Sequence, residues 1–226
     1  MVEKLDRFTC LQYLASKLTE EIVLAWAAFY EWPSLTQDRP MNLHFSMLGC
    51  TIGMGIGLAL ALPHRKVIAL ASDGDVLMEL GALPSMGKED PKNLVVFVND
   101  NETYQTVGGY PTMTHYQTDL AKMATAAGVK HAVTLRKYEQ FKIEVDQALN
   151  SNDCSRFIVL KTEAKPYKTI CDTIEWAESK YRFIKYIEKA EGIKIFPSAV
   201  QDKVLAEKGH SKPKGGPRQT RKKGGK

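Results

Sequence analysis

The chain has few cysteines, and their spacing excludes several kinds of site. Cys10, Cys50, Cys154 and Cys171 form no C-x-x-C pair, so the sequence contains no zinc or iron–sulfur spacing. A disulfide framework is not expected in a chain of 226 residues. We therefore predict reduced thiols and a cytoplasmic location.

The chain also lacks a long apolar run. Residues 47–62 carry no charge, but they number only 16 and include four glycines. A membrane-spanning helix needs about 20 apolar residues, so a buried helix is the better interpretation. The first 15 residues mix acids and bases, and no signal peptide is expected. The sequence predicts no membrane contact.

Acidic residues are absent from residues 208–226, which contain eight of the 31 Lys and Arg residues. Without those eight, 23 basic residues face 26 acidic ones, so the formal charge of +5 comes from the tail. Such a composition does not bury enough apolar surface to fold alone. We interpret residues 193–226 as a disordered terminus, with contact to nucleic acid or an acidic partner as the alternative.

Hydrophobic periodicity predicts a doubly wound parallel α/β sheet flanked by helices, because strand and helix patterns alternate. We expect a helix over residues 5–30 and a loop over residues 31–40, followed by a sheet domain over residues 41–192. The predicted strands cover residues 42–46, 67–71, 94–98, 132–135 and 157–162. The predicted helices cover residues 47–62, 76–87, 119–128, 138–149 and 173–190, and Pro84 is expected to kink or shorten the second of these.

Polar residues follow two of these strands at the edge where open α/β sheets bind ligands. Asp73 and Gly74 follow the strand at 67–71, and Asn101, 28 residues after Asp73, follows the strand at 94–98. Mg²⁺ prefers oxygen ligands, usually one or two from protein and others from phosphate. The side chains of Asp73 and Asn101 and the carbonyl of Thr103 could supply them. Gly74 would allow the backbone to approach a diphosphate.

The glycine-rich helix at 47–62 has a second possible role. Its entrance, near Leu48, Gly49 and Thr51, should present free N–H groups to a phosphate. Gly53 and Gly57 share one face and should permit close approach of a neighbour. Asp75 either caps the helix that follows it or binds a water near the metal, and we favour the cap.

The Ser72-Asp73-Gly74-Asp75 and Asp100-Asn101-Glu102-Thr103 segments resemble the diphosphate and metal motif of thiamine diphosphate enzymes. That motif is usually written GDG followed by NN, so Ser72 and Asp100 depart from it without touching the expected metal ligands. The resemblance extends over residues 40–190 and includes Met47 to Gly57 and the Gly108-Gly109 loop. Within the family, the chain is most similar to the β subunits of sulfopyruvate and phosphonopyruvate decarboxylases.

This resemblance implies thiamine diphosphate and Mg²⁺ as cofactors, with Leu48 supporting the bent cofactor. Met47 is a further candidate, although a place in the core is the simpler interpretation. Substrate contact by Tyr104, Gln105 or Thr106 stays open, as does a proton-donor role for His44 or His115. The residues expected to bind the cofactor are Met47, Leu48, Gly49, Ser72, Asp73, Gly74, Asp75, Asn101, Thr103, Tyr104 and Gln105.

The resemblance also implies a partner, because family members carry a pyrimidine-binding domain whose Glu activates the cofactor. This chain has room for one domain, so that Glu is expected on a separate α subunit in a hetero-oligomer. The predicted function is the cofactor-binding subunit of a decarboxylase acting on a small 2-oxo acid. The alternatives are a subunit of a 2-oxo acid oxidoreductase or of an acetolactate synthase-like enzyme, and a non-catalytic scaffold that uses the basic tail.

Overall fold

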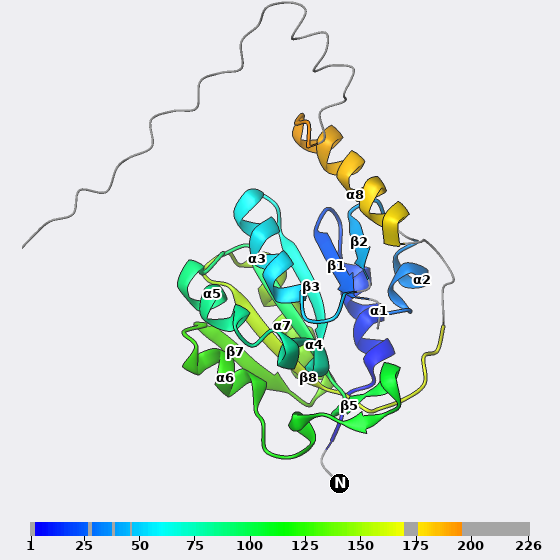
Figure 1. The fold of residues 1–226 in the computed structure, drawn as a ribbon, viewed down its shortest axis with the longest axis vertical. Coiled ribbons are helices and arrows are strands. Elements are labelled where there is room, and N and C mark those ends of the chain that lie inside the picture. The colour runs from blue at the N-terminus through cyan, green and yellow to red at the C-terminus, as the bar shows by residue number, and fades with distance from the viewer. Residues whose placement is uncertain (1–2, 27–28, 38, 46, 170–175, 196–226) are drawn as a thin grey trace, which may run out of the picture.

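A single parallel sheet organises the fold (Figure 1). The computed structural model describes residues 3–26, 29–37, 39–45, 47–169 and 176–195. Its sheet has the strand order β2-β1-β3-β4-β8-β7, and all neighbouring pairs in it run parallel. The strands are β1 (Ile22–Trp26), β2 (Asn42–Phe45), β3 (Val67–Ser72), β4 (Leu94–Asp100), β7 (His131–Leu135) and β8 (Arg156–Lys161). The predicted doubly wound α/β fold is confirmed.

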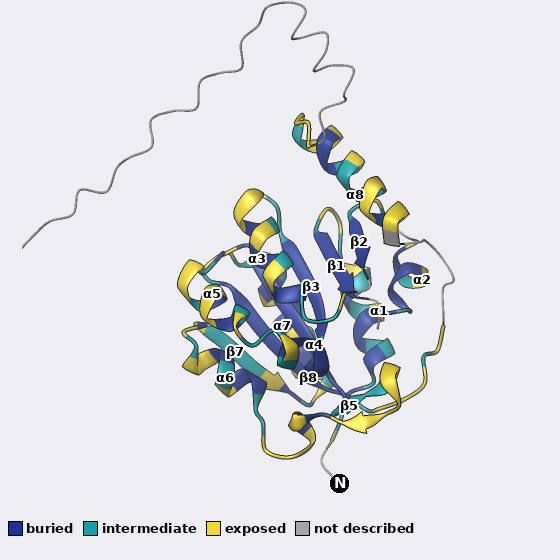
Figure 2. Ribbon diagram, in the orientation of Figure 1, coloured by how far each residue is buried: buried dark blue, intermediate teal, exposed yellow. Residues whose placement is uncertain are grey.

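Helices cover both faces of the sheet and bury two hydrophobic cores (Figure 2). Side chains alternate along each strand, so Ala69 of β3 joins one core and Ile68 and Leu70 join the other. The first face is covered by α3 (Thr51–Ala61), α4 (Asp73–Met78), α5 (Ala82–Glu89), α6 (Leu120–Ala126) and α8 (Trp176–Glu191). The second is covered by α1 (Arg7–Lys17), α2 (Trp32–Thr36) and α7 (Tyr138–Asn150).

A small hairpin lies beyond the carboxyl edge of the sheet. It pairs β5 (Thr103–Tyr104) with β6 (Tyr110–Pro111) in antiparallel fashion. Two short 3₁₀ helices, η1 (Gln105–Val107) and η2 (Met113–His115), complete this segment. The connection after β1 leads to β2 on one side of the sheet, whereas the connection after β3 leads to β4 on the other side. A crevice between β1 and β3 is therefore expected at the carboxyl edge.

The helix predicted over residues 5–30 is wrong in its second half. Residues Ile22–Trp26 form β1, which pairs with both β2 and β3. The sheet thus includes residues from both sides of position 40. All five residues of β1 are buried, and a strand buried on both faces reads as a continuous apolar run without alternation. The loop predicted over residues 31–40 also contains the short helix α2.

Three other expectations change in detail. The helix predicted at 76–87 is two helices, α4 and α5, separated at residues 79–81. Close approach in α3 occurs at Gly55, where an added Cβ would lie 3.1 Å from Leu94 Cδ1, whereas Gly57 has open space. Residues 196–226 of the predicted tail, Cys171 and residues 173–175 of the last predicted helix lie outside the described residues. Among the described helices, none is both long and apolar enough to cross a membrane.

Candidate active site

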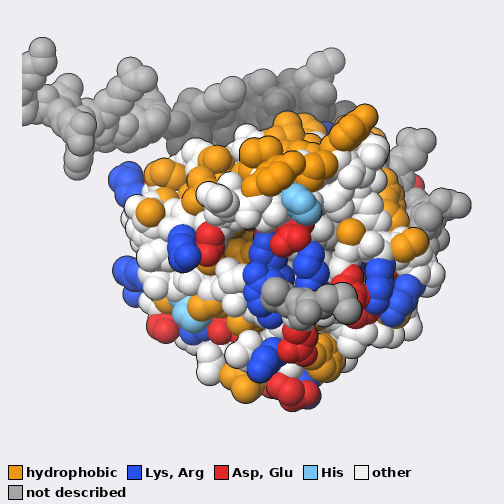
Figure 3. All heavy atoms as spheres, turned by 90° about the horizontal axis from the view of Figure 1, so that it is seen from below, with side chains coloured by type: hydrophobic (Ala, Val, Ile, Leu, Met, Phe, Trp, Pro, Cys, Tyr) orange, Lys and Arg blue, Asp and Glu red, His pale blue; other side chains and the backbone are white. Residues whose placement is uncertain are grey.

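A cavity opens at the carboxyl edge between β1 and β3. It has about 450 Å³ of empty space, which includes its opening to solvent. Figure 3 views the molecule from this side and shows Lys and Arg side chains gathered beside acidic ones. Met47, Gly49, Asp73 and Asp75 do not line the cavity. The predicted cofactor residues that do line it are Leu48, Ser72, Gly74, Asn101, Thr103, Tyr104 and Gln105.

Asp73 is the most constrained of the predicted metal ligands. The parallel pairing of Ser72 with Asn99 places Asp73 beside Asp100 at the sheet edge. The Asp73 side chain is 1% exposed, and its Oδ2 accepts hydrogen bonds from Thr112 Oγ1 at 2.7 Å and Thr114 Oγ1 at 3.2 Å. Burial raises the pKa of Asp73 to about 6, and the charge of Asp100 adds to the rise while Thr112 opposes it. No described Lys, Arg or His forms an ion pair with Asp73.

Asp100, by contrast, has a cation. Its Oδ2 lies 2.7 Å from Lys161 Nζ, and its Oδ1 accepts a hydrogen bond from Thr114 at 2.7 Å. Lys161 also pairs with Glu102 at 3.0 Å, and Glu102 pairs with Lys4 at 2.7 Å. Burial alone would lower the pKa of Lys161, but the two carboxylates outweigh burial and raise it. The Thr114 hydroxyl therefore contacts both Asp100, which is paired with a cation, and Asp73, which has no described counter-cation.

Asn101 is already part of a local turn. Its Oδ1 accepts a hydrogen bond from Thr103 N at 3.0 Å, and its Nδ2 donates to Gln105 Oε1 at 3.0 Å. Gln105 in turn donates to the carbonyl of Lys165 at 2.8 Å. A carbonyl oxygen has two lone pairs, so Asn101 Oδ1 keeps capacity for one further partner. The structure thus orients the amide but does not join Asn101 to Asp73.

The Tyr104 ring occupies the space beside Gly74. A Cβ built on Gly74 would lie 2.6 Å from Tyr104 Cε1. The missing side chain at Gly74 therefore makes room for this ring, in the position where we predicted a diphosphate. Tyr104 belongs to the hairpin segment that contains Gly108 and Gly109, which have φ values of 98° and 74°. Both values require glycine-like backbone freedom.

The entrance of α3 differs from the prediction, because one carboxylate from α4 and one at its C-cap bind N–H groups there. Glu79 accepts hydrogen bonds from Ile52 N at 2.7 Å and Gly53 N at 3.1 Å, and Asp75 accepts one from Gly49 N at 2.6 Å. Burial raises the pKa of Glu79 to about 7, against the effect of these N–H donors. At the entrance predicted to present free N–H groups to a phosphate, Gly49 N is thus bound by Asp75, and the next N–H groups, of Ile52 and Gly53, are bound by Glu79.

Asp75 is also not the cap of its own helix. That cap is Ser72, whose Oγ accepts a hydrogen bond from Asp75 N at 3.3 Å. Asp75 in α4 and Glu79 at its C-cap are four residues apart, and this spacing was the signal that could have revealed the pair.

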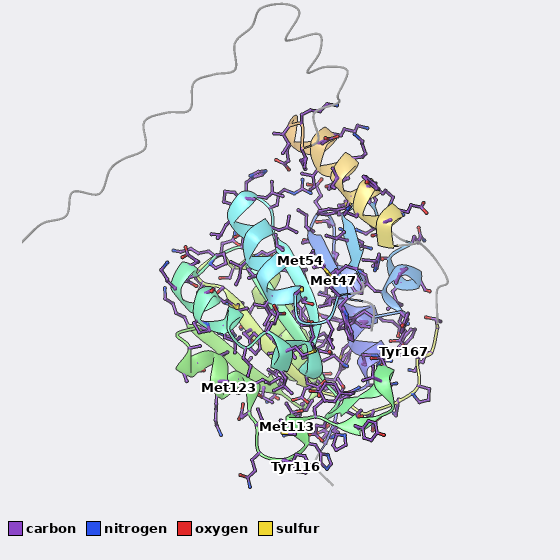
Figure 4. The ribbon with its side chains drawn as sticks, viewed as in Figure 1. Met47, Met54, Met113, Tyr116, Met123 and Tyr167 are labelled. Atoms are coloured by element: carbon purple, nitrogen blue, oxygen red, sulfur yellow. The ribbon has the colours of Figure 1, made fainter. Side chains whose placement is uncertain are left out.

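Of the remaining candidates, Thr106 lines the cavity, whereas Met47, His44 and His115 do not. Met47 is 58% exposed near α3 (Figure 4), so its interpretation as a core residue is wrong. His44 is buried in β2, and its backbone N–H is bound by Ser179 Oγ at 2.9 Å. His115 is exposed and packs edge-on against the ring of Tyr116, which Figure 4 labels. Neither histidine lines the cavity.

Six residues that were not predicted from the sequence also line the cavity: Arg7, Trp26, Phe29, Asn99, Val107 and Tyr167. Arg7 Nε donates to Glu31 Oε2 at 2.9 Å, and its guanidinium lies 4.4 Å from the centre of the Tyr167 ring. Arg7 and Glu31 are 7% and 0% exposed. A charged residue on the apolar side of α1 was the available signal, because buried charges are rare unless they are paired.

Comparison with known proteins assigns this architecture. The family model for "Thiamine pyrophosphate enzyme, C-terminal TPP binding domain" matches residues 23–160. The sulfopyruvate decarboxylase subunit β of Methanocaldococcus jannaschii is 34% identical over 157 residues, which cover 68% of this chain and 81% of that protein. Its counterpart from Methanococcus maripaludis is 30% identical over 193 residues, with 82% and 100% covered.

More distant comparisons involve longer chains. The phosphonopyruvate decarboxylase of Streptomyces viridochromogenes is 40% identical over 133 residues, which cover 57% of this chain and 33% of that protein. The benzoylformate decarboxylase of Polynucleobacter necessarius has a similar fold, with a TM-score of 0.61 and 21% identity. This chain covers 34% of that solved chain, and 73% of this chain is matched.

Proposed function

This chain belongs to the family of thiamine pyrophosphate enzymes that share the C-terminal TPP-binding domain, and from that premise we propose that it is the cofactor-binding subunit of a 2-oxo acid decarboxylase. Sulfopyruvate- or phosphonopyruvate-like acids are the proposed substrates, with thiamine diphosphate and Mg²⁺ as the cofactors. The names of the relatives that match it along most of their length support the reaction and the subunit.

One observation carries the metal site. Asp73 is buried with hydroxyl donors and no described counter-cation, although the neighbouring Asp100 has Lys161. An unpaired buried carboxylate is costly, and a divalent cation would offset that cost. Asn101 lies at the same edge with spare acceptor capacity, and the Thr103 carbonyl follows it. These oxygen donors suit Mg²⁺, which would complete its coordination with diphosphate oxygens and water.

Each part of the site then has a task. Thiamine diphosphate supplies the electron sink that decarboxylation of a 2-oxo acid requires. Asp73 and Asn101 would hold the metal, Ser72 and Gly74 would contact the diphosphate, and Leu48 would support the cofactor from the opposite wall. Tyr104 and the hairpin would exclude water from the cavity.

None of the described residues that line the cavity is a carboxylate that could activate the cofactor. We propose, from the family resemblance, that this Glu comes from a pyrimidine-binding partner, and the longer relatives leave most of their length for further domains. We therefore propose that the active site forms between this chain and an α subunit.

Calorimetric titration of the full chain with thiamine diphosphate tests the proposal, with and without Mg²⁺. Wild-type protein should bind only when Mg²⁺ is present, and Asp73→Asn should weaken binding about ten- to a hundredfold, since a charged contact contributes about 1.5–3 kcal/mol. Asp146→Asn, which alters an exposed carboxylate on α7, is the matched control and should bind normally. Equal affinity in Asp73→Asn and wild type would refute the metal site.

A further inference from the structure

The cavity between β1 and β3 contains one cation and no anion among the described residues that line it. The cation is Arg7, and the other lining residues are neutral. Glu31 binds Arg7 Nε and also accepts a hydrogen bond from Lys168 N at 2.8 Å, but Glu31 does not line the cavity. The terminal nitrogens of Arg7 donate to no described residue. The cavity therefore offers guanidinium N–H groups that carry a positive charge and have no acceptor among the described residues.

Trp26 also lines the cavity and carries a second N–H donor. The residue is 8% exposed at the end of β1, and its indole Nε1–H has no hydrogen-bond partner among the described residues. Leaving a buried donor unsatisfied costs about 1–3 kcal/mol, so such groups usually have a partner in the working protein. A ligand acceptor in the cavity would recover this cost.

Two amide oxygens of the cavity already have a donor each. Asn99 Oδ1 accepts from Thr162 Oγ1 at 2.9 Å, and Asn101 Oδ1 accepts from Thr103 N at 3.0 Å. The Tyr167 ring holds the guanidinium from one side at 4.4 Å, which fixes the direction of its remaining donors. A planar guanidinium with two free N–H groups matches the oxygens of phosphate, phosphonate or sulfonate in a bidentate contact.

We propose that Arg7 and Trp26 bind an oxyanion of this tetrahedral type. Two sources could present it: the diphosphate of the cofactor, or the acidic group that distinguishes sulfopyruvate or phosphonopyruvate from pyruvate. The choice of these two sources rests on the proposed function. The oxyanion contact itself is inferred only from the residues of the cavity.

Trp26→Phe and Arg7→Lys test the assignment. Trp26→Phe removes the indole N–H and keeps an aromatic ring. Arg7→Lys keeps a positive charge next to Glu31 but removes the guanidinium that a bidentate contact needs. Trp32→Phe is the matched control, because Trp32 is also buried with an unpartnered N–H but does not line the cavity. Far-ultraviolet circular dichroism and the melting temperature identify any variant that fails to fold.

The first assay measures binding of pyrophosphate and of phosphonoacetate to the full chain without thiamine. Wild type and Trp32→Phe should bind one or both, whereas Trp26→Phe should bind about tenfold more weakly and Arg7→Lys more weakly still. This assay supports the inference even if thiamine diphosphate itself does not bind. Equal binding of both anions by wild type, Trp26→Phe and Arg7→Lys, or no binding by wild type, would overturn it.

The second assay identifies the source in the enzyme reconstituted with its partner. If the diphosphate is the ligand, the two variants raise the cofactor concentration needed for half-maximal activity and leave the KM for substrate unchanged at saturating cofactor. If the acidic group of the substrate is the ligand, KM for sulfopyruvate or phosphonopyruvate rises about tenfold or more while the parameters for pyruvate and the cofactor stay constant.

Discussion

Replacing Glu79 with glutamine should remove a pH dependence of stability that the entrance of α3 creates. Glu79 accepts two backbone N–H groups of α3, yet burial raises its pKa from 4.5 to about 7, and the nearby charge of Asp75 contributes to the rise. The folded protein therefore binds the Glu79 proton more tightly than the unfolded chain does. The contribution of Glu79 to the free energy of unfolding is therefore greatest below about pH 4.5 and falls as the pH rises toward 7.

The size of the effect follows from the shift. Each pKa unit corresponds to about 1.4 kcal/mol, so the full shift would correspond to about 3 kcal/mol. Glu79 is partly exposed, and solvent screening reduces the expected loss to about 1–2 kcal/mol. Glu79→Gln keeps the shape and one acceptor oxygen but does not ionise, so it should be more stable than wild type at pH 8 and similar at pH 5.

Urea denaturation at several pH values between 5 and 8 measures this difference. Glu139→Gln is the control, because Glu139 is an exposed residue on α7, and its curve should run parallel to wild type. If Glu79→Gln also ran parallel to wild type, or lost stability at pH 8, the reasoning from burial would be wrong. In that case the charge at the entrance of α3 would be favourable.

Two further substitutions test the packing around the site. Gly87→Ala would place a Cβ 2.4 Å from the carbonyl oxygen of Ala127, so it should lower the free energy of unfolding by about 1–3 kcal/mol in urea denaturation. Gly57→Ala is the control, because Gly57 lies in a helix with open space around it, and this variant should be neutral or slightly stabilising. A similar urea midpoint for these two variants would contradict the contact. Lys161→Met should cost about 3–5 kcal/mol, because it leaves Asp100 buried without a cation, and adding Asp100→Asn should recover much of that loss. Denaturation midpoints that show no recovery in the double variant would mean that Lys161 acts mainly through Glu102.

The sheet was largely predictable because most of its strands carry a strong local signal. Residues 94–98 form an apolar run bounded by polar residues, and Asp73 and Asn101 follow the ends of their strands. Parallel pairing then brings those ends to one edge, as the register of Ser72 with Asn99 demonstrates. The meeting of these polar residues at the carboxyl edge of the sheet could thus be predicted from the strands and their direction alone.

The other wall of the cavity was not predictable because it comes from the segment whose secondary structure was misassigned. Residues 5–30 have apolar residues at spacings that suit a helix, and sheet pairing overrides that local preference in β1. Trp26 was therefore placed on a helix face, and Arg7 was not connected with the sheet edge. Glu79 was missed for a different reason, since its N–H partners lie in α3, 26 and 27 residues earlier in the chain.

The position of the Tyr104 ring has a kinetic consequence. A ligand that reaches Gly74 must first displace the ring, because the two share the space where a Cβ would stand. Association then includes a rearrangement of the hairpin, and its observed rate should reach a plateau at high ligand concentration instead of rising in proportion. After the ligand has bound, the same ring would slow its dissociation. The protein would then keep its ligand after dilution for longer than the equilibrium affinity alone suggests.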